Sequence, residues 1–249
     1  MDGTRTHVAP RNAVVWSVLR GELERRAVAG DARLSVLDVG GGSGVFAVPL
    51  AKLGHVLTVV DTSPDALATL QRRAADAGVG ANVVGISADV DHLLDVVGTD
   101  GYDVVLCHSL LEMVDDPATT VGVLATVVRP GGCASLLVAN RAATVLARAL
   151  GGHPEDALRA LTSATGRWHE ADGVLRRFDL AGIAELVTGA GLVVERAHGV
   201  RVVADLVPGA LLDGTPGAVD ALRELELATA ALPPYRDIAT QLHVLARRA

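Results

Sequence analysis

The segment VLDVGGGSG at residues 36–44 constrains the fold most, because a short apolar run leads directly into a loop with four glycines. Glycine lets the backbone approach a bound group closely, and the start of the following helix offers unpaired N–H groups. The segment therefore predicts a strand, a ligand-binding loop and a helix. A tight structural turn is the alternative interpretation.

The glycine spacing narrows the class of ligand. The fingerprint of nicotinamide-binding proteins, G-x-G-x-x-G, needs glycine where Val45 stands, and the Gly-Lys-Ser/Thr of a P-loop is absent. A nicotinamide oxidoreductase is therefore disfavoured.

Carboxylates follow the first strand-like segments. Asp61 ends the second segment, where it can accept hydrogen bonds from both hydroxyls of a ribose bound over the glycine loop. Asp89 follows the third segment and can accept from an adenine amino group. Capping of the next helix is the alternative for both residues. Asp38, just before the loop, either holds the loop or reaches a ligand ammonium group.

Strand-like and helix-like segments alternate through most of the chain, which favours right-handed βαβ units and a doubly wound parallel α/β sheet. We expect one domain over residues 1–249, with an N-terminal helix at 11–28 and a variable insert at about 141–177. The expected strands are 33–39, 55–61, 82–87, 102–108, 133–140, 192–203 and 237–248. The expected helices are 43–53, 63–78, 116–128, 141–151, 178–191 and 218–232.

Composition excludes several other classes of protein. The formal net charge is −7, with one lysine and only six aromatic residues, which disfavours general phosphate-backbone binding and base-stacking surfaces. Cys107 and Cys133 lie in apolar runs and predict buried free thiols and no metal site. No apolar run is long enough to span a membrane, and no signal peptide is evident, so a cytoplasmic protein is expected.

The glycine loop, Asp61 and Asp89 together resemble the class I S-adenosylmethionine-dependent methyltransferases. The resemblance covers residues 33–140 and includes YDVVLCHSLLEMV, which starts at Tyr102, and VVRPGG at 127–132. It implies a Rossmann-like sheet of seven strands with the last strand antiparallel, supplied here by residues 237–248. It also implies S-adenosyl-L-methionine as the cofactor.

Four segments are similar to one subgroup, the bacterial tRNA carboxymethoxyuridine methyltransferases: RNAVVW at 11–16, HSLLEMV at 108–114, GVRVV at 199–203 and the stretch 225–248. This resemblance implies that Arg11 and His108 help to bind the cofactor. A solvated arginine and a packed strand-end histidine are the alternatives. The complete expected cofactor set is Arg11, Asp38, Gly40, Gly41, Gly42, Gly44, Asp61, Thr62, Ser87, Ala88, Asp89 and His108.

The same resemblance implies a carboxylate acceptor held by Arg201 with help from Tyr235. A carboxylate is ionised at neutral pH and needs no general base, so no catalytic residue is assigned. For a hydroxyl or amine acceptor His108 could serve as base, whereas Glu112 is expected to start a helix. The identity of the acceptor stays open: the resemblance implies a tRNA or a small carboxylic acid, although the charge of −7 argues against RNA. Two alternatives remain: a small-molecule O- or N-methyltransferase, and a non-catalytic cofactor-binding protein with this fold.

Overall fold

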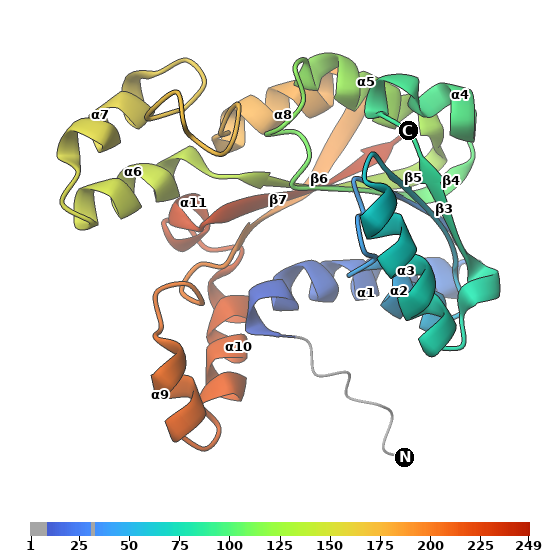
Figure 1. Ribbon diagram of the computed structural model, residues 1–249, viewed down its shortest axis with the longest axis horizontal. Coiled ribbons are helices and arrows are strands. Elements are labelled where there is room, and N and C mark those ends of the chain that lie inside the picture. The colour runs from blue at the N-terminus through green and yellow to red at the C-terminus, as the bar shows by residue number, and fades with distance from the viewer. Residues whose placement is uncertain (1–8, 31–32) are drawn as a thin grey trace.

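The computed structural model describes residues 9–30 and 33–249, which fold around one seven-stranded sheet (Figure 1). The strands are β1 (Ser35–Val39), β2 (Val56–Asp61), β3 (Val83–Ser87), β4 (Tyr102–His108), β5 (Val128–Ala139), β6 (Leu192–Val200) and β7 (Gln241–Arg248). The helices are α1 (Ala13–Val28), α2 (Ala47–Lys52), α3 (Pro64–Asp76), α4 (Leu93–Val97), α5 (Pro117–Val127), α6 (Arg141–Leu150), α7 (Pro154–Thr162), α8 (Leu180–Gly189), α9 (Gly209–Gly214), α10 (Ala218–Thr229) and α11 (Tyr235–Ile238). Short 3-10 turns are η1 (Pro10–Asn12), η2 (Gly80–Asn82) and η3 (Val90–His92).

The strand order is β3-β2-β1-β4-β5-β7-β6. Strands β1 to β5 pair in parallel, and β7 runs antiparallel to both of its neighbours, β5 and β6. The predicted doubly wound sheet with an antiparallel last strand is therefore confirmed. The order reverses at β1, so the carboxyl ends of β1 and β4 flank the point where open α/β sheets bind ligands.

Helices cover both faces of the sheet (Figure 1). One face carries α1, α2 and α3, and its core includes Trp16, Leu50 and Leu70. The other face carries α4, α5 and α8, and its core includes Leu124 and Ile183. The α6–α7 hairpin projects from one end of this body, and α9 and α10 lie below it. Ala, Val and Leu fill both cores, as the low aromatic content requires.

A network of buried charges joins α1 to the sheet at the end away from the glycine loop. Glu22 is fully buried and accepts hydrogen bonds from Arg25, Arg26 and Arg247. Arg26 also donates to Asp103 at 3.1 Å. The charges neutralise one another, so α1 can pack closely on the sheet.

Several expected boundaries are wrong. α2 starts at Ala47, because the turn through positive-φ Gly42 and Gly44 uses the residues expected to begin the helix. β5 already begins at Val128, where residues 116–128 were expected to be helical. The insert contains a helix, α7, in a stretch that shows no clear periodicity in the sequence.

The end of the sheet also differs from expectation. β6 ends at Val200 and so excludes Arg201, which has a φ of +60° that strands do not adopt. Residues 235–238 form α11, which delays the start of β7 to Gln241. Within the described residues, no helix is both long and apolar enough to cross a membrane.

Candidate cofactor and acceptor site

The glycine loop has the backbone conformation that its sequence predicts. Gly40, Gly42 and Gly44 have φ values of +72°, +53° and +75°, which L-residues with side chains rarely adopt. A Cβ on Gly44 would lie 2.2 Å from Leu70 Cδ1, and one on Gly41 would lie 2.5 Å from the Asp38 carboxyl carbon. The glycines are thus needed both for conformation and for space.

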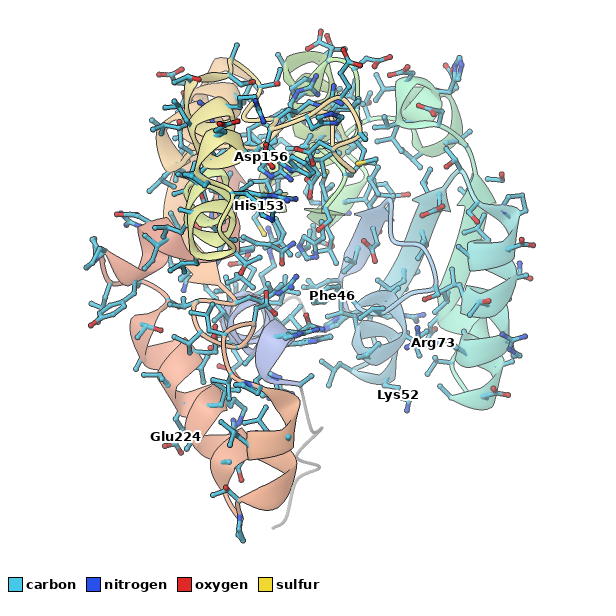
Figure 2. All side chains as sticks on the ribbon, turned by 60° about the vertical axis from the view of Figure 1, so that its left-hand side comes forward. Phe46, Lys52, Arg73, His153, Asp156 and Glu224 are labelled. Atoms are coloured by element: carbon cyan, nitrogen blue, oxygen red, sulfur yellow. The ribbon has the colours of Figure 1, made fainter. Side chains whose placement is uncertain are left out.

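The side chains of Asp61 and Arg73 hold the glycine loop in place through hydrogen bonds. Asp61 accepts from Gly42 N through Oδ2 and from Ser63 N through Oδ1, both at 2.8 Å. Arg73 of α3 donates to the Ser43 carbonyl at 2.9 Å, and Figure 2 shows Arg73 on the side of α3 that faces the loop. Asp61 therefore supports the loop and caps the turn after β2, while its carboxylate keeps free lone pairs for a ligand.

Asp38 lies beneath the loop and is almost completely buried. Burial, and then the nearby Asp61 carboxylate, raise the pKa of Asp38 to about 7. Buried carboxyl groups with raised pKa values concentrate at functional sites, because a ligand can repay the cost of burial. An ammonium group of the ligand near Asp38 would stabilise the ionised carboxylate in this way.

The loop opens onto a cleft of about 360 Å³ at the carboxyl ends of β1 to β4. This size lies within the usual range for small-molecule sites. The cleft brings together residues from the ends of three strands that the sequence singled out: Gly40, Asp61, Thr62, Ala88 and Asp89. It is completed by residues after β4, among them Ser109, Leu110 and Met113.

The third-strand residues have mixed roles. Ser87 ends β3 directly beside Asp61 in the sheet register, but it does not line the cleft. Asp89 lines the cleft and also caps η3, since its Oδ1 accepts from Asp91 N at 3.1 Å. The two interpretations offered for Asp89 are thus compatible in the structure.

His108 ends β4 and is enclosed by aromatic and polar neighbours. Its ring meets Phe46 edge-on, with 4.7 Å between ring centroids, and Phe46 in turn packs against Trp16. Phe46 lies near the middle of the view in Figure 2, below the hairpin that carries His153 and Asp156. Burial lowers the pKa of His108 to about 4, so the imidazole is neutral at pH 7.

The Nε2 atom of His108 lies 2.9 Å from Ser135 Oγ. Ser135 Oγ lies 2.8 Å from His243 Nε2, and His243 Nδ1 lies 3.4 Å from His198 Nδ1. Sequence reasoning missed Ser135, His198 and His243. The strand period places each on one face of its own strand, but only the strand order brings them together.

Arg11 and Arg201, expected at the cofactor and at the acceptor, both pair with Asp205. Arg11 Nε lies 3.1 Å from Asp205 Oδ1, and Arg201 Nη2 lies 2.5 Å from Asp205 Oδ2. Neither arginine belongs to the residues that line the cleft. Tyr235 is about half exposed at the start of α11, and within the described residues no hydrogen bond joins it to Arg201. The roles of all three residues stay predictions.

A buried carboxylate fixes the loop that carries Arg201. Glu226 of α10 is fully buried and accepts from three consecutive backbone N–H groups, those of Val202, Val203 and Ala204, at 2.7 to 3.0 Å. This explains how Arg201 keeps its positive φ. No sequence pattern singles out Glu226, which has the appearance of an ordinary acid on an amphipathic helix.

Glu112 corrects another expectation, because it lies in a turn between β4 and α5 and starts no helix. Its side chain is buried, and burial raises the pKa of the carboxyl to about 6. Its backbone carbonyl accepts from Leu175 N at 2.9 Å, so this turn anchors the end of the 141–177 insert.

The cleft fits an adenosyl cofactor that carries an amino-acid group. The loop cradle excludes a side chain at Gly41, and Asp61 and Asp89 present carboxylates for a ribose and a base amino group. His108 does not itself line the cleft, although the next two residues, Ser109 and Leu110, do. Its Nδ1 is buried and has no hydrogen-bond partner within the described part of the chain. Buried polar atoms are nearly always paired, so a bound group is the expected partner.

Comparison with known proteins agrees with this geometry. Residues 15–197 match the family described as "Methyltransferase domain". The chain is 28% identical to the tRNA 5-carboxymethoxyuridine methyltransferase of Escherichia coli K12, covering 96% of this chain and 88% of that protein. It is 32% identical to the ubiquinone biosynthesis O-methyltransferase of Colwellia psychrerythraea, covering 61% and 59%.

Among solved structures, an S-adenosylmethionine-dependent methyltransferase from Mesorhizobium loti shares the fold with a TM-score of 0.64 and 20% identity, covering 96% of this chain and 100% of that one. The family match extends from α1 through β6 and so includes the glycine loop and His108. The chain therefore belongs to the methyltransferase domain family, and its cofactor is S-adenosylmethionine, as the resemblance carried by the loop and the strand-end carboxylates implied.

Proposed function

We propose that this enzyme transfers a methyl group to a carboxylate, with Arg201 holding the acceptor. The single observation that carries the proposal is the pairing of both Arg11 and Arg201 with the carboxylate of Asp205. Two guanidinium groups are thereby placed around one carboxylate next to the end of β6. Guanidinium is the group best suited to hold a carboxylate through two parallel hydrogen bonds.

A further contact supports a functional connection between this arginine pair and the cleft. Gln241 at the start of β7 donates to Ser109 Oγ at 3.0 Å, and Ser109 lines the cleft. Thr240, the residue before it, donates its N–H to the Arg201 carbonyl at 3.3 Å. A short chain of residues thus connects the arginine loop to the cofactor side.

The chemistry needs positioning more than proton transfer. S-adenosylmethionine supplies a methyl group already activated on a sulfonium, so an acceptor oxygen forms the new C–O bond as the S–C bond breaks and S-adenosylhomocysteine leaves. An ionised carboxylate has no proton to lose. The chain must therefore supply positively charged groups that hold the carboxylate in line with the methyl group.

We further propose that the carboxylate is presented by a tRNA nucleoside, as in the Escherichia coli relative. The α6–α7 hairpin and the loop that follows it carry a hollow whose lining includes two arginines, a tryptophan and one acidic residue. The lining residues are Arg159, Thr162, Ser163, Thr165, Arg167, Trp168, His169 and Glu170. Arg148 of α6 stacks 3.4 Å from the centre of the Trp168 ring. Cationic and aromatic groups together suit single-stranded RNA, despite the net charge of −7.

A hydroxyl acceptor is the second candidate, and His108 favours it. A hydroxyl must lose a proton during transfer, and a neutral imidazole with an unpaired nitrogen at the end of β4 could accept it.

The test uses labelled S-adenosylmethionine with tRNA from a strain that lacks this gene, or with small carboxylic acids. A carboxylate acceptor gives a label that mild base removes as methanol, whereas a methylated hydroxyl or amine keeps it. Arg201→Ala is expected to lower kcat/KM for the acceptor about tenfold or more with unchanged affinity for S-adenosylhomocysteine. The matched control is Arg223→Ala, which removes another arginine paired with a nearby aspartate.

The salt dependence of acceptor affinity distinguishes a tRNA carboxylate from a small carboxylic acid. Affinity for tRNA is expected to fall steeply between about 50 and 200 mM salt, whereas a small acid held by one arginine responds weakly. A base-stable label, or full activity in Arg201→Ala, would contradict the carboxylate proposal and leave the cofactor assignment intact.

A further inference from the structure

Four side chains form a hydrogen-bonded line across the sheet, which we call the histidine file. It runs from His108 through Ser135 and His243 to His198, with successive separations of 2.9, 2.8 and 3.4 Å. These residues lie on β4, β5, β7 and β6, which are neighbours in that order. Ser135 and His243 are fully buried, whereas His198 is only partly buried.

All three imidazoles are neutral at pH 7. Burial lowers the pKa of His108 and of His198 to about 4, and it lowers the pKa of His243 well below its ordinary value. A neutral imidazole carries one proton, so one of its nitrogens donates and the other accepts. The file therefore has few ways to make all three of its hydrogen bonds.

The Ser135 hydroxyl could also accept from both histidines, but its own proton would then have no acceptor among the described residues. Only two proton arrangements therefore make all three hydrogen bonds and also use the Ser135 proton. In the first, His198 Nδ1–H donates to His243, His243 Nε2–H donates to Ser135, and the Ser135 hydroxyl donates to His108 Nε2. His108 then carries its proton on Nδ1. In the second, every donor and acceptor is exchanged, and His108 Nδ1 is bare. The arrangement at one end therefore fixes the tautomer at the other.

The outer end of the file is cationic. Arg196 and Arg236 act on His198, and after burial their charges are the next causes that lower its pKa. The Arg236 backbone comes close to β6, since a Cβ on Gly199 would lie 2.8 Å from Arg236 Cα. Arg236 is itself paired with Asp237 at 2.7 Å, so Arg196 contributes most of the positive charge at this end. Positive charge favours a bare nitrogen on His198 at the outer end of the file, and it therefore favours the first arrangement.

At the inner end, the buried His108 Nδ1 has no partner among the described residues. From this geometry we infer that Ser135, His243 and His198 are positioning residues that hold His108 as the Nδ1–H tautomer, ready to donate to a carboxylate oxygen of the bound cofactor or acceptor. For the acceptor, this inference rests on the proposed function. This tautomer excludes the role of base that the hydroxyl candidate gives to His108, because a base needs a bare Nδ1.

The direct test is nitrogen-15 NMR of histidine-labelled protein, with and without S-adenosylhomocysteine, because the two tautomers of a neutral imidazole have distinct ring-nitrogen shifts. We expect the His108 proton on Nδ1 in the native protein. Ser135→Ala breaks the file and is expected to give mixed tautomers, whereas Ser135→Thr keeps the hydroxyl and is expected to restore Nδ1–H. His92→Gln changes an exposed histidine outside the file and serves as the control.

If Ser135→Ala fails to fold, His198→Phe tests the same point at the partly buried end of the file. A proton on His108 Nε2 in the native protein, or an unchanged tautomer in folded Ser135→Ala or His198→Phe, would overturn the inference. Neither result depends on which acceptor is methylated, so failure here is distinct from failure of the carboxylate proposal.

Binding measurements identify which carboxylate His108 meets. The probes are S-adenosylhomocysteine, which has an amino-acid carboxylate, and 5′-methylthioadenosine, which lacks it. If the cofactor is the partner, Ser135→Ala weakens binding of the first about threefold to tenfold and leaves the second unchanged. If neither affinity changes while the tautomer does, the acceptor carboxylate is the partner. Equal weakening of both would contradict a role for His108 at a carboxylate.

Discussion

Gly41 lies directly over Asp38: a Cβ built on Gly41 would approach the Asp38 carboxyl carbon to 2.5 Å and Val59 Cγ1 to 2.9 Å. Gly41→Ala is therefore expected to push the loop away from β1, with a loss of about 1–3 kcal/mol in stability and a clear loss of S-adenosylhomocysteine affinity. Urea unfolding and calorimetry measure the two effects.

The matched control is Gly122→Ala in α5, where a Cβ meets nothing within 4 Å. It is expected to stabilise the protein by about 0.5–1 kcal/mol, because alanine suits a helix better than glycine. Unchanged cofactor affinity in Gly41→Ala would show that the loop accommodates the added methyl group without moving away from β1.

Asp38 predicts an unusual pH dependence of stability in the ligand-free protein. Its pKa is about 7 in the folded state against an ordinary 3.8, so between these values the folded state binds more protons than the unfolded state. The free energy of unfolding should therefore fall as pH rises from about 4 to 7, by about 4 kcal/mol from this group. Asp38→Asn should flatten that fall and raise the melting temperature at pH 8, while weakening cofactor binding.

Thermal unfolding of both proteins across this pH range tests the point. The control is Asp65→Asn, in the exposed first turn of α3. Parallel pH profiles for the native protein and Asp38→Asn would mean that the Asp38 carboxyl titrates normally.

Asp61→Ala should weaken S-adenosylhomocysteine binding by about 1–3 kcal/mol, the usual loss for a hydrogen bond to a charged group. Part of the loss arises because Gly42 N loses its acceptor at 2.8 Å. Asp61→Asn keeps an acceptor oxygen for Gly42 and separates loop support from ribose binding. Calorimetry that finds native affinity in the alanine variant would leave Asp61 with a capping role alone.

The buried carboxylate of Glu22 predicts that the folded protein loses stability at low pH. Burial alone would raise its pKa, but hydrogen bonds from Arg25 and Arg247 outweigh burial and lower the pKa to about 2 from 4.5. This stabilisation, about 3 kcal/mol, is fully present above pH 4.5 and is lost as pH falls towards 2. Glu22→Gln should cost about 3–5 kcal/mol at pH 7, because three arginines lose their anion.

The control for Glu22→Gln is Glu24→Gln, an exposed position on the same helix. The measurement is urea unfolding at pH 7 and at pH 3. The gap between the native protein and Glu22→Gln should narrow at the lower pH, and a constant gap would contradict the depressed pKa.

The sequence was sufficient for the sheet and for those predicted residues that lie at the ends of the first strands, but not for the position of Arg11. Strand-like runs ending in glycine or aspartate indicated where β1, β2 and β3 stop. Because parallel strands end at one edge, the sequence alone predicts that Gly40, Asp61 and Asp89 lie together, and all three line the cleft. Local patterns work there because each residue's role depends on its own strand end.

The remaining features depend on contacts between distant segments. Glu226 and Asp205 are ordinary acids in the sequence, and their roles arise only where α10 meets the loop after β6. His243 meets Ser135 because β7 inserts beside β5, a pairing of residues 108 positions apart. The pairing of Arg11 with Asp205 could not be predicted either, because a local sequence pattern does not identify a partner far along the chain.

The position of β7 has a consequence for how the chain folds during synthesis. Among the strands that the structure describes, β6 pairs with β7 alone, yet β7 comes after it in the sequence, beyond α10 and α11. While the ribosome is still making that stretch, one edge of β5 and the edge of β6 that pairs with β7 both lack their partner. Open strand edges invite association with other chains. The half-made protein is therefore most exposed to aggregation in the interval before Gln241–Arg248 emerges and closes the sheet.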